Sequence, residues 1–116
     1  MRHRKKTVIL DRKQGPRRAL IKTQAISLIL SKKIKTTEAK AKVLRQVVEK
    51  MITKAKKGTL ASERELMKDL GYEKAVRELV SKIAPQFKDR QGGYTRLTKL
   101  GVRKGDGASL TQIEIL

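Results

Sequence analysis

Hydrophobic and polar residues follow the period of an α-helix from Ile34 to Lys57. With about 100° of rotation per residue, the apolar positions of this stretch fall on one side of the helix. These positions are Val43, Leu44, Val47, Val48, Met51, Ile52 and Ala55. The pattern predicts an amphipathic helix whose apolar stripe forms the floor of the core. We expect a threonine hydroxyl, from Thr36 or Thr37, to cap its first turn, and Gly58 to end it in a left-handed conformation.

A second helix is predicted before this one, from Arg17 to Ser31. Gly15-Pro16 indicates a turn, and proline suits the first turn of a helix. Apolar residues cover more than half of the circumference of the helix, so we expect it to be mostly buried. The segment from Ile34 to Thr37 favours a short strand that leads into the longer helix.

Two shorter helices are predicted after the long one. Ser62-Glu63-Arg64-Glu65 fits a capping box, which would open a helix that ends at Gly71. A further helix is expected over about residues 73–84, because Val76, Leu79, Val80 and Ile83 recur at helical spacing. Proline inside an α-helix removes a backbone hydrogen bond and clashes with the preceding turn, so Pro85 is expected to stop this helix.

The C-terminal third has the two-residue period of β-strands. Tyr94 to Leu100 and Leu110 to Leu116 both alternate, with Ile113 and Ile115 on one face. A glycine-rich basic loop from Gly101 to Ser109 joins them. The pattern predicts an antiparallel hairpin, and its connection exceeds the usual 2 to 5 residues or so, which is often a sign of function.

Charge is the strongest compositional signal. The 116 residues suffice for one domain, and 30 Lys and Arg against 11 Asp and Glu give a formal charge of +19. Repulsion of this size disfavours an isolated compact state, so we expect a polyanionic partner, with nucleic acid the first candidate. Seven of the 11 acidic residues lie between Glu38 and Glu78, and an ordinary solvated helix surface is the preferred interpretation of that region.

The basic residues begin before the first predicted helix. Residues 1–14 contain one acid, Asp11, and a segment so highly charged does not fold alone. A solvated tail is one interpretation, and an arm that orders against phosphates is the preferred one. His3, the single histidine, has no partners for catalysis or metal binding, so phosphate or base contact is expected. The predicted organisation is an RNA-binding arm over 1–14 and one globular α/β domain over 15–116.

The sequence lacks the residues of an active site. It has no cysteine, one histidine and no phosphate-binding loop of the P-loop type, so neither an enzyme nor a metal or cofactor site is predicted. The longest apolar run, residues 25–30, is far below the roughly 20 residues of a membrane span. A soluble intracellular protein without a small-molecule substrate is expected.

Glycines and cations occur together near the C-terminus. Gly92-Gly93 and the loop from Gly101 to Gly107 would let the backbone approach a nucleic acid while arginines bind its phosphates. Simple turn geometry is the alternative interpretation of these glycines. Only three residues are aromatic, so a platform for stacking single-stranded bases is absent. Recognition of a folded RNA through shape and phosphates is therefore predicted.

Six segments resemble a known family. They are MRHRK, RRALI, IKTTEAKAK, IAPQF, DRQGGYTRLTKLG and RKGDGASLTQIEIL. Their residues and order closely resemble the bacterial large-subunit ribosomal protein family number seventeen over essentially the whole chain. The resemblance implies a two-layer α/β (α+β) fold, with about four helices on a small mixed sheet made of the Ile34 strand and the C-terminal hairpin. It also implies a non-catalytic cytoplasmic protein that binds large-subunit ribosomal RNA near the exit tunnel, beside other ribosomal proteins and not as an obligate homo-oligomer.

The resemblance also assigns RNA contact to residues that match the family's motifs. These are Arg2, His3, Arg4, Lys5, Arg18, Arg90, Tyr94, Arg96 and Arg103. Their charge and position add Lys6, Arg12, Lys13, Arg17, Lys22, Lys35, Lys99 and Lys104. The alternative is a DNA-compacting architectural protein, which would need a symmetric dimer and a minor-groove arm or wedge. The sequence shows no self-complementary apolar seam for such a dimer.

Overall fold

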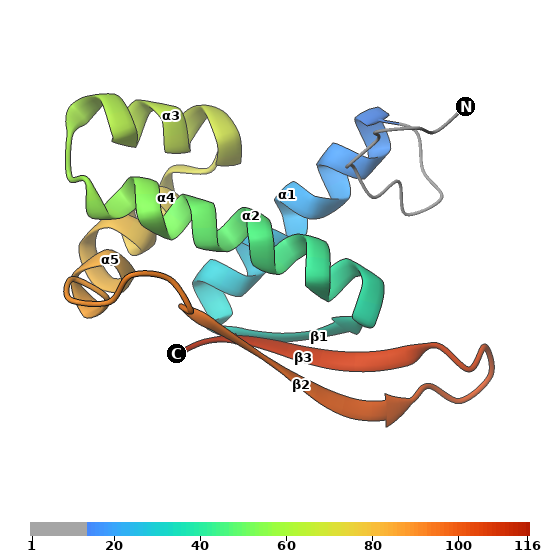
Figure 1. Cartoon of the computed structure of the whole chain (residues 1–116). Coiled ribbons are helices and arrows are strands. Elements are labelled where there is room, and N and C mark those ends of the chain that lie inside the picture. The colour runs from blue at the N-terminus through green and yellow to red at the C-terminus, as the bar shows by residue number, and fades with distance from the viewer. Residues whose placement is uncertain (1–13) are drawn as a thin grey trace, which may run out of the picture.

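The computed structural model describes residues 14–116, whose helices lie on one face of a small sheet (Figure 1). The elements in order are α1 (Gln14–Ser31), β1 (Lys33–Thr37), α2 (Glu38–Lys56), α3 (Leu60–Leu70), α4 (Glu73–Glu78), the π-helix η1 (Leu79–Ile83), α5 (Ala84–Gln86), β2 (Thr95–Val102) and β3 (Ser109–Ile115). The predicted α/β class is confirmed. Residues 1–13 of the predicted arm lie outside the described range, with the predicted contacts Arg2, His3, Arg4, Lys5, Lys6, Arg12 and Lys13, whereas Gln14 begins α1.

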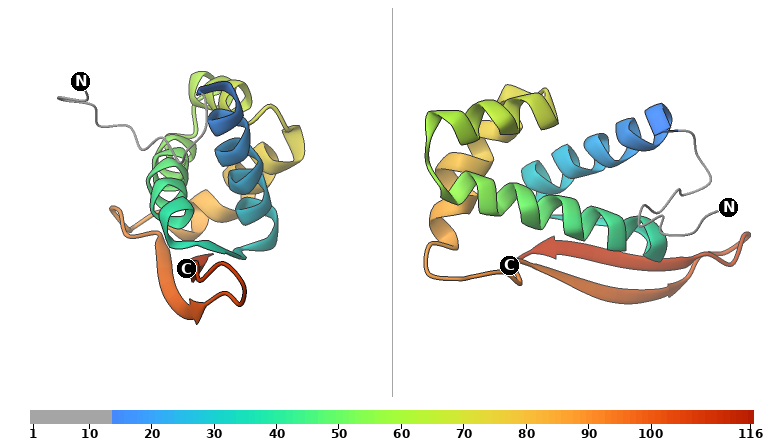
Figure 2. Two further views of the ribbon diagram at one scale, coloured as in Figure 1. Left: turned by 90° about the vertical axis from the view of Figure 1, so that its right-hand side faces the viewer. Right: turned by 45° about the horizontal axis from the view of Figure 1, so that its top comes forward.

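The sheet has the order β1-β3-β2, with β3 in the centre. Both neighbours pair antiparallel with β3, so the sheet is antiparallel throughout and not mixed as expected. Ile113 and Ile115 of β3 are buried, as their alternation predicted, because α1 and α2 cover that face (Figure 2). The opposite face of the sheet is open and polar, and β1 and β2 form its two edges.

Helix α2 spans the core as predicted. Its residues Leu44, Val48 and Ile52 are fully buried against α1, the sheet and the later helices. The expected threonine cap is wrong, because Thr37 occupies the N-cap position but its side chain makes no capping hydrogen bond. Glu38 instead places a negative charge in the first turn, where the helix dipole favours it. Gly58 adopts a left-handed backbone with φ of 66°, as expected.

The predicted capping box of α3 was misplaced by three residues. Thr59 is the N-cap, and its hydroxyl oxygen accepts a hydrogen bond from the Ser62 amide at 3.1 Å. The Ser62 hydroxyl donates back to the Thr59 carbonyl oxygen at 2.8 Å. Ser62 is therefore a buried residue of the first turn, and the helix starts at Leu60. Gly71 ends α3 in the left-handed conformation, as predicted.

The expectation that Pro85 stops the following helix is wrong. The chain passes from α4 through the π-helix η1 into α5, and Pro85 lies inside α5. The Ala84 amide donates to the carbonyl of Leu79, five residues earlier, as a π turn requires. Proline disrupts a helix because it lacks an amide donor and its ring meets a carbonyl of the preceding turn. The wider turn before Pro85 accommodates the ring, and the helix ends one residue later.

Helix α1 begins at Gln14, so Gly15-Pro16 belongs to its first turn and does not precede the helix. Its C-terminal half is buried as expected, with Leu28 and Ile29 at 0% exposure. Its N-terminal half is largely exposed, contrary to the expected burial, because it rises away from the sheet and beyond the other helices (Figure 1). This exposed half carries Arg17, Arg18 and Lys22.

Candidate nucleic-acid interface

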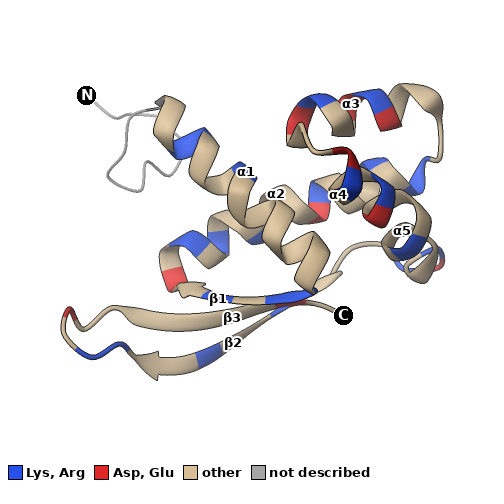
Figure 3. Ribbon diagram, turned by 180° about the vertical axis from the view of Figure 1, so that it is seen from behind, with Lys and Arg blue, Asp and Glu red and all other residues tan. Residues whose placement is uncertain are grey.

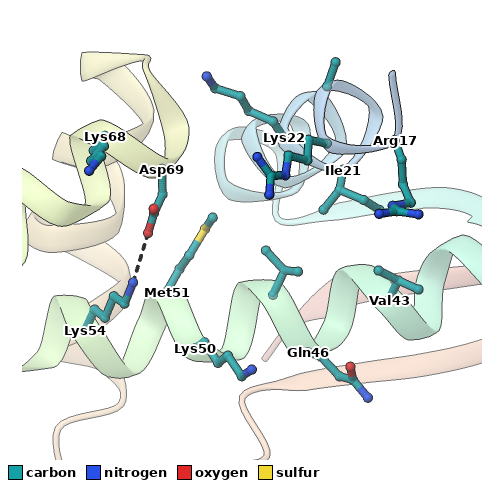
Figure 4. Close-up of a pocket in the computed structure, with 13 residues that line it drawn as sticks. Arg17, Ile21, Lys22, Val43, Gln46, Lys50, Met51, Lys54, Lys68 and Asp69 are labelled. Carbon is teal, nitrogen blue, oxygen red and sulfur yellow. Dashed lines mark hydrogen bonds and ion pairs between the residues drawn. The ribbon is translucent and has the colours of Figure 1, made fainter. Parts of the chain in front are cut away.

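An open cleft of about 880 Å³ lies between the N-terminal half of α1, helix α2 and the end of α3 (Figure 4). Its floor is apolar and is formed by Ile21, Val43, Val47 and Met51. Basic side chains from all three helices surround this floor. They are Arg17, Arg18, Lys22, Lys50, Lys54 and Lys68, and we call this set the cleft cations.

The spacing of residues along α2 explains how this helix contributes both apolar and basic side chains to the cleft. Val43, Val47, Lys50 and Lys54 follow one another at intervals of four, three and four residues, which places them on one face of the helix. Beyond Val47 this face passes from apolar to basic, next to the residues of α1 and α3 that line the same cleft. The long lysine stems cover apolar surface and keep their ammonium groups in water.

Lys22 connects α1 to the end of α3. A Cβ added at Gly71 would lie 3.0 Å from the Lys22 Nζ, so this ammonium reaches the C-terminal end of α3. The C-terminus of a helix carries partial negative charge, which attracts a cation. Glycine is required at this position by its left-handed φ of 66°, and it also leaves room for the lysine.

One of the cleft cations is already neutralised. The Lys54 Nζ lies 3.0 Å from Oδ2 of Asp69 and 3.8 Å from Oε2 of Glu65. Its hydrogen bond with Asp69 raises the pKa of Lys54 above 10.5. The other five cleft cations form no ion pair within residues 14–116. The cleft thus concentrates unneutralised positive charge on three packed helices.

The tip of the hairpin, residues 103–108, is a second basic site and lies at the same end of the molecule as the start of α1 (Figures 1 and 3). Lys104 is exposed there. The guanidinium of Arg103 is occupied by Asp106: its Nε donates to Oδ1 at 3.1 Å and its Nη2 donates to Oδ2. Arg103 was predicted to contact RNA directly, and the structure gives it a bidentate partner within the chain.

This ion pair makes a prediction about acid titration. Hydrogen bonds from Arg103 and from the Ala108 amide lower the pKa of Asp106 from 3.8 to about 2. Because the folded pKa is the lower one, the ion pair stabilises the tip fully above pH 3.8, and this contribution is lost as the pH falls towards 2. Carboxyl NMR titration of the intact chain should therefore give a midpoint near 2 for Asp106, moving up towards 3.8 in Arg103→Ala. A titration midpoint near 3.8 for Asp106 in the unchanged chain would contradict its pairing with Arg103.

The open face of the sheet is a third polar surface, separate from the cleft. The register places Lys33, Glu114 and Arg96 in one row across the three strands. Arg96 Nη1 lies 3.3 Å from Oε1 of Glu114, so part of its charge is balanced. Lys35 occupies the next row of this face, and Lys99 lies opposite Thr111 on the side of the helices.

Two predicted contacts lie at the other end of the molecule, in the connection before β2 (Figure 1). Arg90 is exposed in this connection. The structure does not leave Tyr94 available for the predicted RNA contact. The residue is only 2% exposed, and its ring packs on Phe87 with centroids 5.0 Å apart. Its hydroxyl donates to the Arg90 carbonyl at 3.1 Å and accepts from Lys56 at 3.0 Å, and the hydrogen bond from Lys56 lowers the pKa of Tyr94 below 10. Tyr94 is thus a core residue whose ring has no free face for a base.

The structure brings together only part of the predicted set. Arg17, Arg18 and Lys22 share the cleft, and Arg103 and Lys104 share the nearby hairpin tip. Three further cations of the cleft were not predicted from the sequence: Lys50, Lys54 and Lys68. The available signal was the continuation of the apolar face of α2 into lysines, but the pairing of that face with α1 and α3 is a tertiary property.

Residues 14–116 contain no candidate metal site and no candidate membrane-spanning helix. In that range no group of three or more His, Cys, Asp or Glu side chains is placed to hold a metal ion. No helix in the described part of the chain is long and apolar enough to cross a membrane.

The comparisons with known proteins all give one family, over most or all of the chain. The family model described as ribosomal protein L17 matches residues 20–116. The large ribosomal subunit protein bL17 of Gemmatimonas aurantiaca is 48% identical over 116 residues, which cover all of this chain and 98% of that protein. The bL17 protein of Desulforapulum autotrophicum is 44% identical over 116 residues, covering all of this chain and 97% of the relative. The bL17 protein of Natranaerobius thermophilus is 47% identical over 107 residues, covering 92% and 95%.

Proposed function

The chain belongs to the ribosomal protein L17 family, and on this premise we propose that it is a structural component of the large ribosomal subunit that binds and clamps folded ribosomal RNA. It acts in the cytoplasmic ribosome, near the exit tunnel of the nascent chain, and contributes no catalysis. The observation that carries the proposal is the cleft, where five unneutralised cations lie on three packed helices.

The cleft cations differ from those of an ordinary basic surface because packed helices hold them at fixed positions. Contacts to phosphates position a protein on a nucleic acid but do not read its sequence. A purely electrostatic complex with 6 to 10 phosphate contacts loses about 10³ to 10⁵ in affinity between 50 and 200 mM salt. Cations held at fixed separations by helices instead favour one three-dimensional arrangement of phosphates. A folded RNA offers such an arrangement, whereas regular duplex DNA offers a repetitive one.

The test is competition between RNA and DNA. The purified full-length chain is titrated with folded large-subunit ribosomal RNA and with duplex DNA of equal length, over a range of salt concentrations. We expect tighter binding to the RNA at every salt concentration, and a monomeric protein by sedimentation. Equal or tighter binding to the DNA by a stable dimer would overturn the proposal in favour of a DNA-compacting protein.

The end of the molecule formed by α3, α4 and η1 differs from the cleft in its charge. Apart from Lys68 and Asp69, which line the cleft, residues 60–86 contain four basic and four acidic side chains, so this part of the molecule has no net charge in a chain of +19. Figure 3 shows the two signs mixed along α3 and α4. A groove of about 570 Å³ lies between these helices, and Leu60 and Met67 on it are 63% and 41% exposed. We propose that this neutral groove faces a neighbouring ribosomal protein, because its charged side chains balance one another and its exposed apolar side chains suit a protein partner better than phosphates.

Photo-crosslinking in assembled large subunits checks this orientation. A benzophenone side chain at Leu60, in the neutral groove, is expected to crosslink to protein. The matched position is Gln46, which is also exposed but lines the cleft, and there we expect crosslinks to ribosomal RNA. RNA adducts from Leu60 comparable to those from Gln46 would contradict the proposed orientation.

A further inference from the structure

The basic hairpin tip contains one acidic residue, Asp106, at the centre of its hydrogen bonds. Oδ1 of Asp106 accepts from Nε of Arg103 at 3.1 Å and from the Ala108 amide at 3.1 Å. Oδ2 accepts from Nη2 of the same arginine. The backbone closes the same loop, because the Arg103 amide donates to the Ala108 carbonyl at 2.8 Å and the Gly107 amide donates to the Arg103 carbonyl at 3.2 Å. We call this set of bonds the clasp.

The protein core does not hold the tip in place. Residues 103–107 are all exposed, and the tip extends past the end of the helices (Figures 1 and 2). Gly105 and Gly107 have φ of 101° and 69°. Glycine adopts such positive values readily, but it adopts negative values as readily, so these residues do not fix the conformation of the tip. Ordering such a segment on binding has a cost in conformational entropy. The clasp is therefore what keeps the tip in one conformation.

An aspartate is an unexpected residue on a surface for phosphates. Its charge repels a polyanion, and it neutralises the neighbouring Arg103. If charge alone decided RNA binding, removing the Asp106 carboxylate would strengthen it. If conformation decides, removal would weaken binding although the chain becomes more positive. The two views predict changes of opposite sign.

We infer that Asp106 is a positioning residue, which through the clasp holds the hairpin tip in the conformation that presents Lys104 and the tip backbone to RNA phosphates. This inference rests on the proposed RNA-binding function. It also gives Arg103 a different role from the one expected of it: the arginine shapes the tip, and Lys104 makes the contact.

The experiment measures binding of the full-length chain to folded large-subunit ribosomal RNA. Asp106→Ala is expected to bind about three- to tenfold more weakly, because the tip must then be ordered on binding. The ratio to the unchanged chain should be the same at about 100 and 300 mM salt, since no phosphate contact is lost. Asp89→Ala, which removes an exposed acid near Arg90, is the matched control and is expected to bind equally well or more tightly.

Variants of Arg103 separate positioning from direct contact. As part of the clasp, Arg103→Ala should weaken binding without changing the salt slope, and the double variant with Asp106→Ala should be no weaker than either single one. As a direct phosphate contact, Arg103→Ala would lower the slope by about 0.9. Asp106→Glu, which keeps the carboxylate, should recover part of the affinity.

The outcomes distinguish this inference from the proposed function. If the unchanged chain binds the RNA and Asp106→Ala binds equally well or more tightly, the positioning role is wrong and the RNA-binding function stands. A reduced slope in Arg103→Ala would likewise overturn it. If the unchanged chain does not bind folded ribosomal RNA, both the function and the positioning role are wrong.

Discussion

Replacing Leu44 by alanine is expected to lower the free energy of unfolding by about 3 kcal/mol, because the residue is fully buried at the centre of α2. Helix α2 packs on α1, α3 and the sheet, so a cavity at Leu44 lies where all layers of the fold meet. Urea unfolding followed by circular dichroism measures the change. A loss below about 1 kcal/mol would contradict the central place of α2 in the core.

The neighbouring residue supplies the control. Arg45 lies on the outer side of α2, where its Nε is 3.8 Å from Oε1 of Glu49 and its side chain is 46% exposed. An exposed ion pair of this kind contributes between zero and about 1 kcal/mol. Arg45→Ala should therefore leave the unfolding free energy almost unchanged, which separates burial from a general sensitivity of the helix.

Neutralising the cleft should have the largest effect on RNA binding. In the variant with Arg17, Lys22 and Lys50 all replaced by glutamine, we expect the slope of log K against log salt to fall by about 2 to 3, since each lost phosphate contact contributes about 0.7 to 0.9. The affinity at low salt should fall on the order of 100-fold, because each charged contact contributes about 1 kcal/mol or more. Binding titrations with folded large-subunit ribosomal RNA measure both quantities.

A control with the same change in charge uses the neutral end of the molecule. Lys74, Arg77 and Lys82 are exposed on α4 and η1, and replacing them with glutamine also removes three positive charges. We expect this variant to retain nearly all of the salt slope. If both triple variants lose equal affinity, net charge and not the cleft governs binding.

Local patterns in the sequence predicted most elements of the fold. The 3.6-residue period of α2 and the alternation of Ile113 and Ile115 each depend on one buried face, and both were confirmed. The misplaced cap of α3 has a local cause: Thr59 and Ser62 both fit the role of N-cap, and composition does not choose between them. The prediction that Pro85 stops the helix failed for a tertiary reason, since burial of Leu79 and Ile83 in the π turn and of Ala84 after it favours a continuous helix.

The candidate site was less predictable than the fold. Lys50 of α2 and Lys68 of α3 join Lys22 of α1 only because the three helices converge. Tyr94 was predicted to contact RNA because it lies in a segment that matches the family's motif, yet its ring is buried in the core beneath Lys56. Arg103 looked like a phosphate ligand because of its charge, and its spacing of three residues from Asp106 carried the signal for an internal pair. Charge therefore indicated the class of partner but not which side chains remain free to contact it.

Lysine reactivity tests the central claim most directly, because it compares the cleft with the neutral end of the same molecule. The full-length chain and intact large subunits are treated with an amine-reactive reagent, and modification is quantified at each lysine by mass spectrometry. Lys22, Lys50 and Lys68 of the cleft should be reactive in the free chain and protected in the subunit, whereas Lys74 and Lys82, which line neither the cleft nor the neutral groove, should be protected far less. Cleft lysines that remain as reactive in the subunit as in the free chain would contradict the account.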